Sequence, residues 1–132
     1  LGDRIELLGD VSRRRSLELQ RDSEALLLLI PESGGRGRGV LTGKIFEYLA
    51  AERPILAAVP PDGAAAELVR DTGVGVVVPS DDVDALREAL LDLHRRWQAG
   101  TLDGTPLSGE WRRRLSRGER VEELADLLRS LA

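Results

Sequence analysis

Short aliphatic runs alternate with amphipathic stretches along the whole chain of 132 residues. Apolar runs of strand length occupy residues 5–8, 25–30, 54–59 and 75–78. Apolar residues at helical spacing predict helices over 13–22, 42–53, 64–70, 83–97 and 121–131. We therefore predict an α/β domain with a Rossmann-like, mainly parallel sheet flanked by helices. The runs 25–30 and 54–59 are typical of strands buried on both faces.

Polar residues and glycines beside these runs predict where the helices begin and end. Ser12 is a candidate N-cap for the first helix, and Asp81 or Asp82 for the fourth. Gly73 fits a helix C-cap, and Gly75 fits a close approach at the start of a strand. The fourth helix carries an apolar stripe that we expect to face the core, formed by Val83, Leu86, Leu90, Leu93 and Trp97.

The stretch 42–56 organises the rest of the chain. At about 100° per residue, one helix face carries Ile45, Phe46, Leu49 and Ala50, which predicts a core contact. Another face carries Lys44, Glu47 and Ala51. Pro54 excludes the α conformation from the residue before it, so we expect it to end the helix. Glycine before the first turn leaves the helix amides open to an anion.

Composition excludes several classes of function. The chain has no cysteine and one histidine, so we expect no disulfide and no metal site. The net charge of −4 argues against binding to nucleic acid. No apolar run is long enough to span a membrane and nothing at the start is typical of a signal peptide, so we expect a cytoplasmic protein without membrane contact. A first residue of leucine and the absence of methionine suggest a piece of a longer protein.

Two consecutive motifs resemble a known family: TGKIFEYLAAERPIL and GAAAELVRDTGVGVVVPSDD. They are similar to the carboxy-terminal, nucleotide-sugar-binding half of retaining glycosyltransferases of the GT-B fold. In that family a G-K-x-x-E-Y-L-A helix precedes a P-I-L-A strand, an A-E-L helix and a G-x-V-V strand. The resemblance extends from about Ile5 to Leu93, and more loosely to the end. It implies one donor-binding domain over 1–132, with a helical tail over about 107–132.

The resemblance also implies a reaction and its partners. Such enzymes transfer a sugar from a nucleotide diphosphate to an acceptor hydroxyl with retained configuration. The nucleotide sugar and an N-terminal acceptor-binding domain would be the partners, with no cofactor. In the family, an arginine and lysine pair upstream of this region stabilises the departing diphosphate, so we expect nucleotide binding without turnover from this chain. The alternatives are a non-catalytic nucleotide-binding or partner-binding module and a sugar epimerase of the same fold.

The resemblance assigns Glu47 to the ribose, because a carboxylate accepts hydrogen bonds from two vicinal hydroxyls. Thr42, Gly43 and the backbone of Lys44 would lie near the pyrophosphate. The alternative is an ordinary ion pair between Lys44 and Glu47 on a solvated helix face. In similar proteins the backbone at the position of Val11 contacts the nucleobase, although 9–11 also suits a plain turn after a strand.

Glu32 is a weaker candidate. The family often has two glutamates eight positions apart, the first near the transferred sugar, whereas here fifteen positions separate Glu32 from Glu47. Glu32 is therefore a candidate for the sugar or an ordinary loop carboxylate. The glycine-rich segment 33–39 is a surface loop, a phosphate-binding loop that uses its amides and Arg36 or Arg38, or, least favoured, an RNA-binding segment.

The resemblance has a consequence for the sheet. In the family two further strands precede the one that matches Ile5 to Leu8, and their absence leaves an edge of the strand 25–30 unpaired. Three outcomes follow: residues 5–8 pair with this edge, a second copy does so, or the chain belongs to a longer polypeptide. We predict a homodimer, because an open apolar strand edge is a template for another chain.

Overall fold

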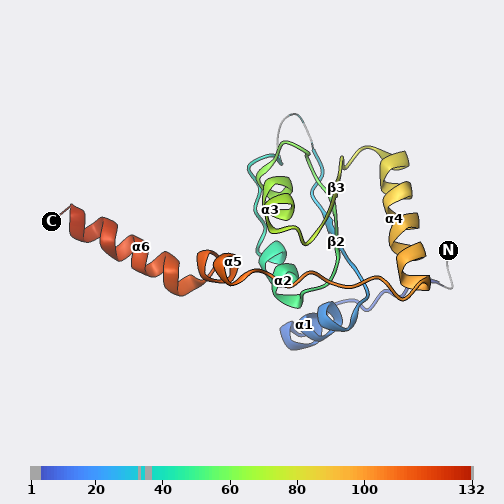
Figure 1. Cartoon of the computed structure of the whole chain (residues 1–132), viewed down its shortest axis with the longest axis horizontal. Coiled ribbons are helices and arrows are strands. Elements are labelled where there is room, and N and C mark those ends of the chain that lie inside the picture. Colours follow the sequence, from blue (N-terminus) through green and yellow to red (C-terminus); the bar gives the residue numbers. More distant parts are fainter. Residues whose placement is uncertain (1–3, 33, 35–36, 132) are drawn as a thin grey trace.

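The computed structural model describes residues 4–32, 34 and 37–131, and its centre is a parallel sheet of three strands. The strands, in spatial order, are β1 (Leu26–Leu29), β2 (Ile55–Ala58) and β3 (Gly75–Val78). The helices are α1 (Arg13–Asp22), α2 (Gly43–Ala51), α3 (Ala64–Thr72), α4 (Val83–Gln98), α5 (Gly109–Arg114) and α6 (Arg117–Ser130). Helices α2 and α3 lie on one side of the sheet and α4 on the other (Figure 1). The predicted α/β class with a parallel sheet is confirmed.

Local signals set most of the boundaries. The Ser12 side chain accepts a hydrogen bond from the N–H of Arg15, and Asp82 accepts one from the N–H of Ala85. Gly73 ends α3 in the left-handed region with φ 68°, as predicted. A side chain on Gly75 would place Cβ 2.1 Å from the carbonyl oxygen of Ile55, so only glycine allows this pairing of β3 with β2.

The two faces of the sheet pack against different helices. On the α2 and α3 side, the core contains eleven buried residues, which are Leu28, Ile30, Ile45, Leu49, Ile55, Ala57, Val59, Ala65, Ala66, Val69 and Val74. On the α4 side, Leu56, Ala58 and Val78 pack with Leu93. The strand β2 is buried along its whole length, because it has a neighbour on each edge and helices on both faces.

Two expectations about the core were wrong. Phe46 is 41% exposed and Ala50 is also exposed, so only Ile45 and Leu49 of the expected α2 face are buried. Of the predicted α4 stripe, Leu93 is buried and Leu86 packs against the core, whereas Val83, Leu90 and Trp97 are exposed; Ala85 and Ala89 take their place on the face towards the sheet. The helix α2 also ends before the point set by Pro54, because Glu52 takes the left-handed conformation with φ 55°.

The strand β1 is buried on one face only, which corrects the prediction for 25–30. Leu26 and Leu28 are buried, whereas Leu27 is 51% exposed and Leu29 is 60% exposed. The helix α4 covers β2 and β3 and leaves the β1 side of that face open. The strand predicted at 5–8 is also wrong: these residues are irregular and exposed, so they do not pair with β1.

After α4 the chain runs in an extended segment to α5 and α6. We call these two helices the C-terminal arm (109–130). The helix α5 lies beside α2, and α6 points away from the sheet (Figure 1). The tail helix is therefore confirmed, but its apolar residues are exposed, namely Val121, Leu124, Leu127 and Leu128. None of the helices in the described residues is long and apolar enough to cross a membrane.

We predict that the chain forms a homodimer through β1. The N–H of Leu26 donates to Pro54 and that of Ile30 to Ala58, both on the β2 side, so the backbone groups of Leu27 and Leu29 point outward. The same two residues have exposed side chains, so an added strand would satisfy the backbone and place its own side chains beside the leucines. Light scattering at increasing concentration should give the mass of a dimer.

The variant Leu29→Lys should be monomeric at the same concentrations, because a charge on an edge strand opposes pairing. Leu90→Lys, a substitution of a leucine on α4 that is also more than half exposed, is the matched control and should remain dimeric. A parent chain that stays monomeric at high concentration and melts cooperatively would contradict edge pairing.

Candidate functional site

Three loops meet at the carboxyl edge of the sheet, and Arg38 joins two of them. Its Nε and Nη2 atoms lie 3.2 and 3.0 Å from Oε1 of Glu32, which follows β1. Its Nη1 atom lies 3.0 Å from Oδ2 of Asp62, which follows β2. The backbone N–H of Glu32 donates to Oγ of Ser80, which follows β3, at 3.3 Å. Glu32 and Arg38 therefore connect loops, which is the ordinary structural role left open for Glu32.

The same loop closes the N-terminus of α3. The N–H of Ala64 donates to the carbonyl oxygen of Arg38 at 2.7 Å. A Cβ on Gly63 would lie 2.9 Å from that oxygen, so glycine is needed for the approach. The first N–H group of α3 is thus bound by the chain itself. We expected Arg36 or Arg38 to bind phosphate. Arg36 lies outside the described residues, and the Arg38 guanidinium is paired with the carboxylates of Glu32 and Asp62.

The N-termini of α2 and α3 have no side-chain cap, unlike those of the other four described helices. Ser12, Asp82, Ser108 and Ser116 cap their helices with a side-chain oxygen. Thr42 makes no such bond at the start of α2. Its hydroxyl is buried and, within the described part of the chain, has no hydrogen-bond partner. A buried polar group without a partner costs about 1–3 kcal/mol, and the first-turn N–H groups of α2 likewise have no side-chain cap.

Glu47 lies one turn further along α2 and is held from α1. Its Oε1 atom lies 3.3 Å from Nη2 of Arg13, and its Oε2 atom accepts a hydrogen bond of 3.3 Å from Nε2 of Gln20. The Glu47 side chain is 30% exposed, so it can still accept further hydrogen bonds. The alternative pair between Lys44 and Glu47 is absent from the described residues, where Lys44 forms no ion pair and is exposed.

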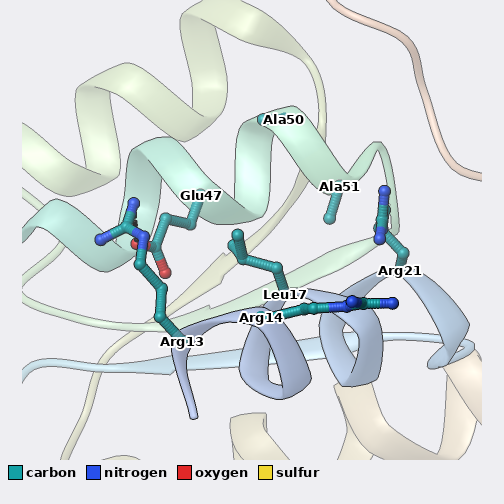
Figure 2. Close-up of a pocket in the computed structure, with 7 residues that line it drawn as sticks. All are labelled: Arg13, Arg14, Leu17, Arg21, Glu47, Ala50 and Ala51. Carbon is teal, nitrogen blue, oxygen red and sulfur yellow. Dashed lines mark ion pairs between the residues drawn. The ribbon is translucent and has the colours of Figure 1, made fainter.

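A groove of about 460 Å³ separates α1 from α2. Figure 2 shows Leu17 of α1 and Ala51 of α2 between the two helices, with Arg14 and Arg21 at one end, and Ala50 also lines the groove. At the other end the ion pair of Arg13 and Glu47 closes the groove (Figure 2). An apolar floor between guanidinium groups suits a flat ring or the apolar part of an anion.

A second cavity, of about 840 Å³, lies on the other side of Glu47, and we call it the elbow cavity. Gly43, Phe46 and Glu47 of α2 line one wall. Ala64, Glu67, Leu68 and Asp71 come from α3. Five residues come from the C-terminal arm, and these are Trp111, Arg114, Leu115, Arg117 and Arg120. The first turn of α2 and the Glu47 carboxylate therefore face the same cavity.

Two features of the site raise the pKa of Tyr48, the residue next to Glu47. Burial against the core raises the pKa of the Tyr48 phenol above its ordinary value of 10.0, and the neighbouring charge of Glu47 raises it further. Both causes disfavour the phenolate in the folded state.

The structure brings Gly43 and Glu47 to one cavity, with Thr42 and Lys44 beside them at the same helix end. Val11 precedes α1 and is 39% exposed, and it lines neither the groove nor the elbow cavity. Glu32 lies at the neighbouring loops. Sequence reasoning missed Gln20 and the arginines of the arm, because no local pattern indicates that they reach α2.

Comparisons of this chain with protein-family models, with curated proteins and with solved structures find no match. Among the described residues, no three histidine, aspartate or glutamate side chains gather where they could hold one metal ion. The geometry of the site therefore carries the functional argument.

We predict that Thr42→Val stabilises the protein. The substitution removes a buried hydroxyl that lacks a protein partner, so the free energy of unfolding should rise by about 1 kcal/mol. Thr72→Val is the matched control: its hydroxyl donates to the carbonyl of Leu68 at 2.6 Å, and its loss should destabilise by a similar amount. Chemical denaturation measures both. Equal destabilisation by the two substitutions would contradict an unpartnered Thr42.

A second prediction concerns the titration of Tyr48, the only tyrosine of the chain. Glu47→Gln should lower the pKa of Tyr48, yet leave it above 10 because burial persists. Since the pKa of Tyr48 is raised in the folded state, the contribution of its protonated phenol to the free energy of unfolding is complete below pH 10. This contribution is lost as the pH rises through the folded pKa. Ultraviolet absorbance of the phenolate measures the shift, and an unchanged titration curve would place the Glu47 charge away from the ring.

Proposed function

We propose that this chain is the donor-binding domain of a retaining glycosyltransferase and binds a nucleotide diphosphate sugar. The observation that carries the proposal is the pairing of an uncapped helix N-terminus with a carboxylate one turn later on the same cavity. The motif GKIFEYLAA, which resembles the family, is the segment that forms this helix.

Each part of the ligand meets a group of matching chemistry. The diphosphate lies at the first turn of α2, where the N–H groups of Gly43 and Lys44 and the helix dipole favour an anion. The ribose hydroxyls donate to the Glu47 carboxylate. One helical turn, about 6 Å along the axis, separates Gly43 from Glu47, which suits one nucleotide lying along α2.

Arg13 and Gln20 prepare Glu47 for this role. Arg13 and Gln20 each hold one oxygen of the carboxylate from α1, which limits its rotation. A positioned carboxylate loses little conformational entropy when the ligand binds, which favours affinity.

In the proposed reaction the leaving diphosphate gains negative charge as the bond to the sugar breaks. Amides aimed at that charge in the first turn of α2 stabilise the transition state more than the ground state. The acceptor would be bound by the N-terminal domain that the family resemblance implies. This chain's contribution is to bind and orient the donor.

We predict that Glu47→Ala weakens binding of the nucleotide by about 1–3 kcal/mol, because charge-assisted hydrogen bonds to the ribose are lost. The melting temperature should change little, since the side chain is partly exposed and leaves no cavity in the core. Calorimetric titration with a panel of nucleotide sugars measures the affinity.

Glu88→Ala, at an exposed position of α4, is the matched control and should bind like the parent. If Glu47→Ala melts like the parent and binds the same nucleotide equally well, the ribose assignment is wrong. Saturable binding of a free nucleotide without preference for any nucleotide sugar would favour the non-catalytic nucleotide-binding module.

A further inference from the structure

The C-terminal arm forms one wall of the elbow cavity, opposite α2. Trp111 and Arg114 of α5 line this wall, and Arg117 and Arg120 of α6 extend it. A guanidinium wall facing an uncapped helix N-terminus offers an anion two sources of positive charge from opposite sides.

Packing fixes the position of α5. Leu107 and Leu115 contact the core beneath α2 and α3. Arg112 forms an ion pair with Glu52 at the C-terminal end of α2, and its Nε donates to the carbonyl oxygen of Leu107 at 3.1 Å. The chain also passes close to Glu52 at Gly104, where a Cβ would lie 1.7 Å from the Glu52 carbonyl oxygen. The arm is therefore anchored on the same helix that carries the candidate site.

The arginines of the cavity differ in their partners. Arg13 pairs with Glu47, and Arg120 binds both the Arg114 carbonyl and Glu123. Within residues 4–32, 34 and 37–131, Arg114 and Arg117 form no ion pair. The Arg114 guanidinium lies 4.8 Å from the centre of the Trp111 ring, a stacking contact that orients it without neutralising its charge. These two arginines can bind an anion without breaking an existing ion pair.

The carboxylates of the cavity indicate where an anion binds. Glu47 on α2 is paired with Arg13, whereas Glu67 and Asp71 lie on α3, which carries no cation in the lining of the cavity. Repulsion from the Glu67 and Asp71 carboxylates disfavours an anion near α3. The favourable position for an anion is therefore between α2 and the arm. The Arg38 carbonyl at the first amide of α3 disfavours the α3 side as well.

We propose that Arg114 and Arg117 bind the phosphate groups of the ligand from the side opposite the first turn of α2. This inference rests on the proposed function and adds to it a set of phosphate-binding residues supplied by the arm. The two guanidinium groups neutralise the diphosphate, while the amides of Gly43 and Lys44 meet its other side.

The test uses the double variant Arg114→Gln/Arg117→Gln of the full chain and three probes: a nucleoside diphosphate, the matching nucleoside and inorganic pyrophosphate. The double variant should bind the nucleoside diphosphate and pyrophosphate at least tenfold more weakly, and the nucleoside as the parent does. The dependence of affinity on salt should also decrease, because fewer charges take part. Arg114→Lys/Arg117→Lys keeps the charge and should recover part of the affinity.

The matched control is Arg87→Gln/Arg113→Gln, which also removes two positive charges but from residues outside the elbow cavity. Arg113 lies on the same helix as Arg114, so this variant separates a local effect from a change of net charge. It should bind all three probes like the parent. Thermal melting of each variant verifies that it is folded.

The outcomes separate the inference from the proposed function. Loss of nucleotide binding in Glu47→Ala, with the double arginine variant unaffected, overturns the role of the arm and keeps the donor site. Pyrophosphate binding that depends on Arg114 and Arg117, in a parent that binds no nucleotide, supports the anion site and overturns the donor proposal. A parent that binds none of the probes overturns both.

Discussion

The burial of Ile45 and Leu49 beneath the sheet is the constraint on which the site depends. These two side chains are almost fully buried between β1, β2 and α3, and they fix the rotation of α2 about its axis. With that rotation set, Glu47 faces α1, and Phe46 and Gly43 face the elbow cavity. Each buried aliphatic side chain contributes about 1.5–3 kcal/mol, far more than the exposed ion pairs around the site. The core therefore holds the charges in place.

The two crossover helices on this face begin in different ways, and the difference assigns their roles. The carbonyl of Arg38 occupies the first turn of α3, and Gly63 is the residue that allows it to approach. The first turn of α2 has neither a side-chain cap nor, among the described residues, a partner for the Thr42 hydroxyl. The free N–H groups at the first turn of α2 are therefore the ones to which the proposal assigns an anion.

Most of the fold could be predicted from local pattern. The helix α1 with its Ser12 cap, the C-cap at Gly73 and the close approach at Gly75 each depend on residues within a few positions, so the sequence indicates them directly. Burial of β1 could not be predicted in this way, because the exposure of Leu27 and Leu29 depends on which strands and helices lie beside them. A run of leucines gives the conformation of a strand, whereas its neighbours decide which faces are covered.

In the candidate site, too, local residues could be predicted from the sequence and contacts between distant residues could not. Gly43 and Glu47 could be identified because they belong to one helix and one motif. The contacts from Gln20 to Glu47 span 27 positions and the anchor from Arg112 to Glu52 spans 60, and neither has a periodic signature. Arginines 112–114 are equivalent in sequence, yet one anchors the arm, one lies outside the elbow cavity and one lines it. Their roles follow from the direction in which α5 leaves the core, and Leu107 and Leu115 set that direction by packing against it.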